Sequence, residues 1–437
     1  MSEFAFNPLQ GGWLAVESKA TPMHVGGLLY FRPPRGADED YVPALVRDWL
    51  GQTAVVEPWN LKLRPGPARG LQPGWQPDAD FDLEYHFRHS ALPAPGGERE
   101  LGSLVSRLHS HRLDRARPLW ECHLIEGLAG GRFALYLKVH PALFDGDGLL
   151  RMLGGFLADK PQQRGMRPPW CHTPARPPAA PRGASSPWAM VRAVADRLRG
   201  GFLTAEPWGG PRKAPRSALN THIGPARRFA TQSYSQDRLG AVARRFAVRE
   251  DMVFYALIGG ALRRFFREYN ALPERSLVAL IADRSRDDGL LAPVSLSLAT
   301  RHADPVRRLK ELSRSLAISE RMLRLLPAAD ARAQGAMSAL TYLTRLATGL
   351  DHRLPPMFNL AVARMNFSEQ PLYFNGARLE AVFPMPMLLQ GGALTIACLR
   401  YAGDWHIGLT GARDNLPHLQ RIAVYMGLAL DQLENAK

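Results

Sequence analysis

A stretch rich in proline and small residues divides this 437-residue chain near its middle. Between residues 159 and 215 it contains PQQRGMRPPWCHTPARPPAAPRGASSPW, which can continue neither a long helix nor a central strand. The segments on either side are each long enough to bury a core. We therefore expect an N-terminal domain at residues 1–157, a linker at 158–215 and a C-terminal domain at 216–437.

Part of the predicted linker has the pattern of a helix. In residues 187–203 apolar side chains recur at helical spacing and arginines occupy the other face, while Pro187 suits a first helical turn. A basic amphipathic helix can lie on an anionic membrane. A connector helix packed against one of the domains explains the pattern equally well, so both alternatives stay open.

The chain carries a formal net charge of +15. Such an excess favours nucleic acid, an anionic membrane face, or a phosphate-bearing ligand such as a coenzyme A thioester. The arginines are scattered, and no zinc-finger spacing, RNP-like strand or long basic run accompanies them. We therefore expect no nucleic-acid partner, and the other two classes remain.

Cysteine usage and the N-terminal sequence indicate the compartment. Cys122, Cys171 and Cys398 are widely separated and form neither a CxxC pair nor a disulfide framework. The N-terminus lacks a charged segment followed by an apolar one, and no run of about eighteen apolar residues occurs. We expect a cytoplasmic protein, at most peripheral to the inner membrane or to lipid bodies.

Both halves mix strand and helix patterns. Residues 132–139 have the pattern of a strand, and helical spacing follows shortly after His140. Asn375-Gly376 is a two-residue hairpin signal, and we expect a closing amphipathic helix after a cap at Asp414/Asn415. No GxGxxG or P-loop points to a nucleotide-binding sheet. The prediction is an α/β protein of two similar sandwich domains with a site between them.

The segment at residues 117–148 contains a distinctive motif. Its sequence, RPLWECHLIEGLAGGRFALYLKVHPALFDGDG, resembles the centre of the wax ester synthase/diacylglycerol acyltransferase family, with its proline-leucine-tryptophan element and its His-His-x-x-x-Asp-Gly motif. His140 matches the first motif histidine, Asp145 and Gly146 match the end of the motif, and Pro141 stands in place of the second histidine. Further blocks along nearly the whole chain resemble the family in order and spacing.

The resemblance implies a fold and an activity. The fold would be two chloramphenicol acetyltransferase-like domains, similar to condensation domains, with an active-site tunnel between them. The activity would be transfer of an acyl chain from acyl-CoA, a co-substrate and not a bound cofactor, to a long-chain alcohol or diacylglycerol. The products would be wax ester or triacylglycerol, and an anionic membrane or lipid-droplet surface would be a partner.

The change at position 141 bears on the mechanism that the resemblance implies. Proline has no titratable group, and losing a general base is expected to lower the rate by about 10²–10⁴. His140 is the catalytic candidate that remains, as a base or orienting group, although adjacent side chains at the end of a strand face opposite sides. The alternative is a partly buried histidine bonded to backbone. Asp145, the second candidate, is expected to be structural and to pair with Arg286.

The other candidate residues have simpler interpretations. Pro118, Leu119 and Trp120 are expected to pack in the core. The histidines have no metal-ligand spacing with one another, so we expect no metal; those considered are His24, His86, His89, His123 and His406. No Gly-x-Ser-x-Gly elbow is present, and no cysteine has the context of a nucleophile. We therefore expect direct attack of the acceptor on the thioester.

Two alternatives to an acyl-CoA-dependent O-acyltransferase remain. One is a catalytically silent homologue that binds acyl chains or pairs with an active acyltransferase. The other is a transferase that uses a carrier-protein thioester or an amine acceptor, since an amine needs less help from a base. Retained binding without turnover would distinguish the first from an enzyme.

Overall fold

The computed structural model describes residues 8–64, 74–144, 146–173, 214–283, 292–324, 341–342, 344–345, 348–349 and 353–436. Within these residues the strands form two six-stranded sheets and one two-stranded ribbon. The α/β class expected from the sequence is confirmed. The predicted amphipathic helix at residues 187–203 lies outside the described residues.

The first sheet combines strands from both halves of the chain. Its order is β11-β12-β1-β6-β5-β4. The strands are β1 (Val25–Arg32), β4 (Phe87–Ala91), β5 (Trp120–Leu128), β6 (Arg132–Val139), β11 (Tyr373–Phe374) and β12 (Ala377–Met385). β12 runs antiparallel to β1, with Leu28 opposite Phe383. The domain boundaries at 157 and 216 stay predictions, but this sheet takes two strands from beyond both of them.

Helices and a ribbon surround the first sheet. These elements are α1 (Pro8–Val16), α2 (Tyr41–Leu50), β2 (Leu61–Leu63), β3 (Trp75–Pro77), α3 (Leu83–His86), α4 (Glu98–Ser110), α5 (Gly146–Phe156) and the 3₁₀ turn Pro169–Cys171. Of these elements, α4 and α5 are the ones that bear on the functional site, because both reach the junction with the second sheet.

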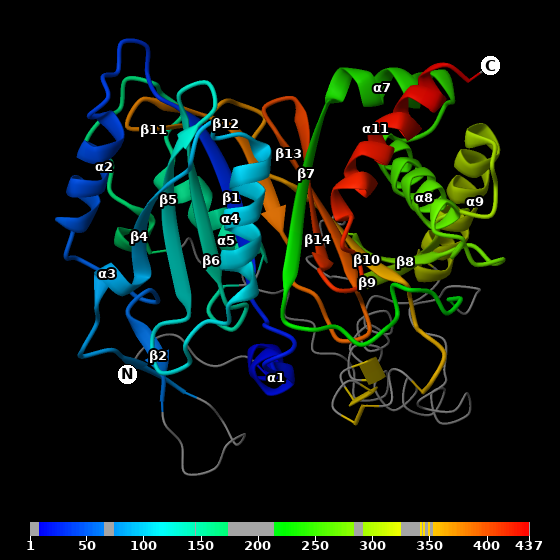
Figure 1. Cartoon of the computed structure of the whole chain (residues 1–437), viewed down its shortest axis with the longest axis horizontal. Coiled ribbons are helices and arrows are strands. Elements are labelled where there is room, and N and C mark those ends of the chain that lie inside the picture. Colours follow the sequence, from blue (N-terminus) through cyan, green and yellow to red (C-terminus); the bar gives the residue numbers. More distant parts are fainter. Residues whose placement is uncertain are drawn as a thin grey trace.

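The second sheet has the order β7-β14-β13-β10-β8-β9. Its strands are β7 (Arg227–Ser235), β8 (Val278–Asp283), β9 (Ala292–Ser297), β10 (Leu360–Asn366), β13 (Leu394–Tyr401) and β14 (Asp404–Ala412). β10 lies parallel to both β8 and β13, and the remaining pairs are antiparallel. The helices beside it are α7 (Gln236–Arg245), α8 (Glu250–Glu268), α9 (Pro305–Arg324) and α11 (Leu419–Glu434). Figure 1 shows the two sheets in the two halves of the view, and at their junction α4 contacts β7, the edge strand of the second sheet.

Several elements predicted from local sequence are confirmed. β6 has the predicted bounds, and α5 follows His140 after a short turn. Asn375 and Gly376 form the tight turn between β11 and β12, with φ of 47° and 87°. Both residues thus occupy the left-handed region that a two-residue hairpin of this type requires.

The start of the closing helix differs from the prediction. The helix begins at Leu419, after a turn, and Asp414/Asn415 do not cap it. The side-chain amide of Asn415 instead donates to the carbonyl of His222. Pro417 also disfavours a helical conformation at the residue before it, which delays the helix. Among the helices of the described ranges, none is both long and apolar enough to cross a bilayer.

The proline-leucine-tryptophan element packs in the core, as expected. Leu119 and Trp120 are fully buried. The indole Nε1 of Trp120 donates to the carbonyl of Trp59 at 2.7 Å, and its ring stacks on Trp170 with centroids 5.6 Å apart. This aromatic cluster supports the start of β5, where Trp120 pairs with Val139, the last residue of β6.

The two sheets meet closely where β12 crosses β14. A Cβ atom built on Gly408 would lie 1.8 Å from the carbonyl oxygen of Pro384. Contacts that close do not occur, so only glycine allows the backbones to approach in this way. The same part of β12, Pro384 and Met385, also lines a cavity between the sheets.

Because the two backbones approach so closely at Gly408, adding one methyl group at this position should have a large effect on the stability of the protein. Gly408→Ala should destabilise the protein by about 2 kcal/mol or more, because backbone on both sheets must shift. Gly155→Ala is the matched control, because a Cβ on this helical glycine meets nothing within 4 Å and should stabilise by about 0.5–1 kcal/mol. Urea denaturation measures both. Equal stabilities for the two variants would contradict the packing described.

Candidate active site

The predicted motif forms a turn between β6 and α5. The backbone N–H of His140 donates to the carbonyl of Leu119 at 3.0 Å. The carbonyl of His140 accepts from the N–H groups of Leu143 and Phe144 at 2.8 and 3.1 Å. Pro141 is buried within this turn, and its ring fixes the local φ. Position 141 therefore lies in the interior without a titratable group.

The ring of His140 is enclosed and has a defined hydrogen-bonding state. Its Nδ1 accepts the backbone N–H of Ala142 at 3.0 Å, so the proton of the neutral ring lies on Nε2. Nε2 has no hydrogen-bond partner among the described residues. Burial, together with the charge of Arg115, lowers the pKa of His140 to about 3. The geometry fits the expected structural alternative, and it presents Nε2–H as a donor.

The remaining predicted site residues separate into three groups. Asp145 and Arg286 lie outside the described residues, so their pairing stays a prediction. Gly146 begins α5 and lines a cavity. Pro118, Leu119 and Trp120 support the motif from the core and do not line that cavity.

A cavity of about 270 Å³ lies between the two sheets beside the motif. We call it the apolar cavity. Its walls come from α5, the start of β1, the end of β12, and the strands β10 and β13. The residues from these elements include Val25, Gly26, Gly27, Gly146, Leu149, Leu150, Leu153, Ala361, Ala363, Met365, Val382, Pro384, Met385, Leu394 and Leu399. Such a lining favours an aliphatic chain over a polar ligand.

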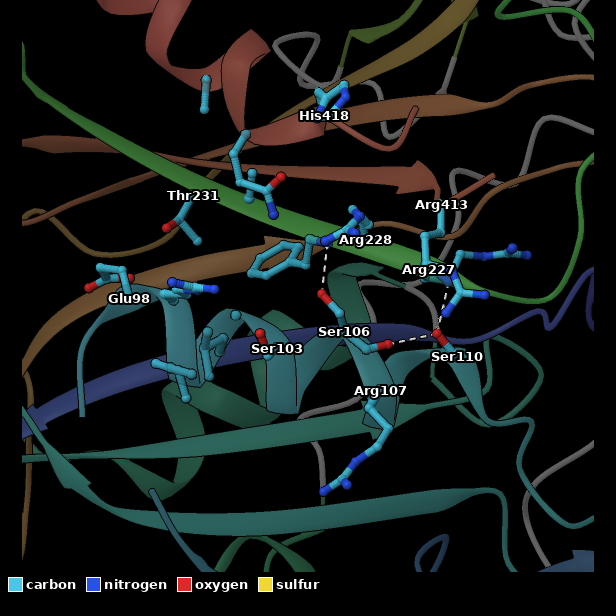
Figure 2. A pocket seen from close by; sticks show the side chains of 18 of the residues that line it. Glu98, Ser103, Ser106, Arg107, Ser110, Arg227, Arg228, Thr231, Arg413 and His418 are labelled. Atoms are coloured by element: carbon cyan, nitrogen blue, oxygen red, sulfur yellow. Dashed lines mark hydrogen bonds between the residues drawn. The ribbon is translucent and has the colours of Figure 1, made fainter. Parts of the chain in front are cut away.

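A larger and basic groove of about 1250 Å³ lies between α4, β7 and α11 (Figure 2). We call it the basic groove. Its cationic and histidine side chains are Arg99, Arg107, His111, Arg227, Arg228, Arg413 and His418. Its acidic residue among the described lining is Glu98, which accepts a hydrogen bond from Tyr30 at 2.9 Å. The groove is therefore electropositive and suited to an anionic ligand.

Arg227 and Arg228 are the central cations of this groove. The guanidinium of Arg227 donates to the backbone carbonyls of Gly224 and Ala20, and no described carboxylate pairs with it. Burial lowers the pKa of Arg227 to about 10, which still leaves it charged at neutral pH. The Nε of Arg228 is buried without a hydrogen-bond partner among the described residues. A buried cation without a counter-ion is costly, and an anionic ligand would offset that cost.

Two serines of α4 hold the walls of the groove together. The hydroxyl of Ser106 accepts from the N–H of Phe229 at 3.0 Å, and that of Ser110 accepts from the N–H of Arg227 at 2.8 Å (Figure 2). The hydroxyl of Ser110 donates in turn to the carbonyl of Ser106. These bonds attach α4 to β7 and therefore fix the positions of Arg227 and Arg228 on that strand.

The described residues offer few groups for covalent or metal chemistry. Cys122 and Cys398 are buried, and burial raises the pKa of each thiol. Cys171 donates to the carbonyl of Ala54. Across the described ranges, no three His, Cys, Asp or Glu side chains converge as metal ligands would.

The basic groove was not identified from the sequence. Its arginines come from α4, β7 and the end of β14, and only Arg227-Arg228 are adjacent in the chain. The net charge indicated an anionic ligand, but the scattered arginines could not be assigned to one surface without the fold.

Two family models match most of the chain. Residues 6–251 match the wax ester synthase/diacylglycerol acyltransferase catalytic domain, and residues 291–434 match the WS/DGAT C-terminal domain. A Mycobacterium tuberculosis protein named as a diacylglycerol O-acyltransferase is 38% identical, over 97% of this chain and 96% of that protein. The O-acyltransferase WSD of Acinetobacter baylyi is 32% identical, over 96% and 94%.

Solved structures agree with these sequence matches. The wax ester synthase/diacylglycerol acyltransferase of Marinobacter aquaeolei superimposes with a TM-score of 0.84 at 34% identity, covering 98% of each chain. The starter condensation domain of rhizomide synthetase matches with a TM-score of 0.55 at 15% identity, over 99% of this chain and 95% of that one. The second match shows that the fold is condensation-domain-like, as expected from the sequence.

The state of His140 predicts a pH dependence of stability. The unfolded ring binds a proton near pH 6.5, whereas the folded ring stays neutral to about pH 3. Between these values the unfolded state binds more protons, so stability falls as the pH is lowered. His140→Gln should reduce the slope by at most about 1.4 kcal/mol per pH unit. Urea denaturation from pH 7 to 4 measures it, and an unchanged slope would contradict the assignment.

Proposed function

The chain belongs to the wax ester synthase/diacylglycerol acyltransferase family, and from this membership we propose that it transfers an acyl chain from acyl-CoA to a long-chain alcohol or diacylglycerol. As a member it is an acyltransferase, and acyl-CoA is the co-substrate of such enzymes. The observation that carries the finer proposal is the pairing of a basic groove with an apolar cavity at the junction of the two sheets.

The basic groove is the proposed site for coenzyme A. Coenzyme A carries a diphosphate and a 3′-phosphate, and arginine binds phosphate oxygens with strong, directional hydrogen bonds. Arg227 and Arg228 stand in the groove without a described carboxylate partner. The phosphates of coenzyme A would supply the missing negative charge.

The apolar cavity is the proposed site for an aliphatic chain. Its lining is mostly apolar, with glycine, alanine, leucine, valine, methionine and proline residues from five strands, one helix and the connections between them. Each buried methylene of a ligand contributes about 0.8 kcal/mol. Methionine side chains adapt to ligands of different shape, which suits a cavity that receives chains of more than one length.

Direct attack of the acceptor on the thioester is the proposed course of reaction. A covalent acyl-enzyme requires an activated nucleophile. The hydroxyls of Ser106 and Ser110 in the groove are engaged by backbone groups, and Cys122 and Cys398 are buried thiols of raised pKa. None of these four groups is placed as such a nucleophile. The acceptor and acyl-CoA would therefore be bound together.

Removing an arginine from the groove should weaken coenzyme A binding. Arg228→Gln should raise the dissociation constant of coenzyme A about tenfold, or about 1.4 kcal/mol, through loss of a charged hydrogen bond. The control is Arg47→Gln, which removes an exposed arginine of α2 paired with Asp40. Isothermal titration calorimetry at two salt concentrations measures both. Equal affinities for Arg228→Gln and the control would place coenzyme A elsewhere.

The transfer reaction itself has a direct test. We expect the wild-type chain to release coenzyme A from palmitoyl-CoA only when hexadecanol or diacylglycerol is present, with one ester formed for each thiol released. Pro141→His is the comparison, because it restores the histidine that the family motif has at this position. If only Pro141→His turns over, the chain is an inactive homologue on an intact scaffold and the proposed activity is wrong.

A further inference from the structure

A lysine is fully buried beside the C-terminal end of α4. Lys138 lies in β6, and its ammonium donates to the backbone carbonyls of Leu108 and His111 at 3.2 and 3.1 Å. Its Nζ also lies 2.8 Å from a carboxylate oxygen of Glu121, the residue opposite it in β5. An ammonium has three N–H donors, so these three partners use all of them. The side chain therefore has one defined position.

The bonds from Lys138 cap the C-terminal end of α4. The helix ends at Ser110, and Lys138 bonds one carbonyl of its last turn and the carbonyl of His111, the residue after it. Such carbonyls carry partial negative charge and lack donors from a further turn, so a cation beside them is favoured. Leu101 and Val105 bury the same helix against the first sheet, but apolar contacts are not directional. The bonds from Lys138 therefore help to set where this end of α4 lies.

The charge of Lys138 is balanced within the first sheet. Burial alone would raise the pKa of Glu121, but His123, 3.7 Å from its carboxylate, and Lys138 outweigh burial and hold that pKa at about 2. Burial lowers the pKa of Lys138, and Glu121 opposes this shift. A buried ion pair is often no more stabilising than apolar residues of the same volume. Stability alone is therefore a weak reason for a charged pair at this position.

α4 is also joined to the second sheet. β7 lies at the edge of that sheet and pairs with β14, so the N–H groups on its outer side need other acceptors. The hydroxyls of Ser106 and Ser110 accept two of them, from Phe229 and Arg227 (Figure 2). Arg227 and Arg228 begin β7 and are the central cations of the basic groove. Because the groove lies between α4 and β7, the placement of its cations depends on where α4 is held.

We propose that Lys138 is a positioning residue for the phosphates of coenzyme A, an inference that rests on the proposed function of the basic groove. Within the described part of the chain, Lys138 lines neither the groove nor the apolar cavity, so it acts through α4 and not by contact with the ligand. Its bonds hold the last turn of α4 against the first sheet, and Ser110 passes that position on to Arg227 of the second sheet. The arginines then meet the phosphates at a fixed spacing.

The first measurement compares two variants that break the same ion pair. Lys138→Met removes the bonds to α4, whereas Glu121→Gln keeps the amine of Lys138 and its bonds to the two carbonyls. Isothermal titration calorimetry with the purified full chain measures the dissociation constant of coenzyme A. Lys138→Met should raise it about tenfold, the equivalent of one charged hydrogen bond. Glu121→Gln should leave it within about twofold of the wild type.

The kinetic constants separate positioning from a general loss of structure. With palmitoyl-CoA and hexadecanol, Lys138→Met should raise KM for palmitoyl-CoA about tenfold and leave kcat near the wild-type value, because only ground-state binding of the phosphates is weakened. A protein that is merely less stable loses active molecules, which lowers kcat at an unchanged KM. Lys138→Arg keeps a cation with several donors and should recover part of the lost affinity.

The link from α4 to Arg227 has its own test, which decides the question even where Lys138→Met does not fold. Ser110→Ala removes the acceptor of the Arg227 N–H and should raise the dissociation constant of coenzyme A by about three- to tenfold. In the double variant, Lys138→Met should cost less affinity than it costs alone, because both changes act through the same contact. Urea denaturation of each variant shows that the measured protein is folded.

The outcomes that overturn the proposal are distinct. If Lys138→Met binds coenzyme A as tightly as the wild type, or if Glu121→Gln weakens binding equally, the bonds to α4 do not position the groove. If Ser110→Ala keeps the wild-type affinity, α4 does not place Arg227. If the wild-type chain itself binds no coenzyme A, the proposed function of the groove fails and this inference fails with it, before any variant is compared.

Discussion

Backbone pairing between β1 and β12 is the constraint on which the site depends. β1 belongs to the first half of the chain and β12 to the second, yet the two strands pair antiparallel along the whole of β1 except its first residue, with one register shift between Tyr30 and Phe31. The end of β12 then crosses β14 at Gly408, where the absence of a side chain lets the sheets approach. The apolar cavity is bounded by both of these contacts. The two halves of the molecule therefore cannot be separated without dismantling the cavity.

The junction also divides the site electrically. On the side of α4 and β7 the lining is cationic, with Arg227 buried and without a described counter-ion. On the side of α5 the lining is aliphatic. The proposed acyl-CoA would place its phosphates on the cationic side and its aliphatic chain on the other. The charge of Arg227 acts more strongly than it would in water, because the side chain is buried.

Much of the local structure could be predicted because its signals are local. The alternation of residues 132–139 defines β6, and Asn375-Gly376 suits only a tight left-handed turn. The replacement at Pro141 is visible in the sequence too. The surroundings of Pro141 are not visible there. The hydrogen bond from the N–H of Ala142, which sets the tautomer of His140, depends on how the turn folds.

The parts that could not be predicted depend on distant contacts. Nothing near His24 in the sequence shows that its ring meets the backbone carbonyl of His109, 85 residues away. The sharing of β12 with the first sheet was equally invisible, because strand exchange changes neither composition nor periodicity. The cap expected at Asp414/Asn415 does not form, because the side-chain amide of Asn415 bonds the carbonyl of His222, which is close in space but 193 residues away in the chain.

The central claim is that one acyl-CoA binds with its phosphates in the basic groove and its acyl chain in the apolar cavity. A crystal structure with a non-hydrolysable palmitoyl-CoA thioether tests it most directly. The account predicts phosphates at Arg227 and Arg228 and the alkyl chain against Leu149 and Leu153. Phosphates remote from both arginines, or an alkyl chain bound elsewhere, would contradict it.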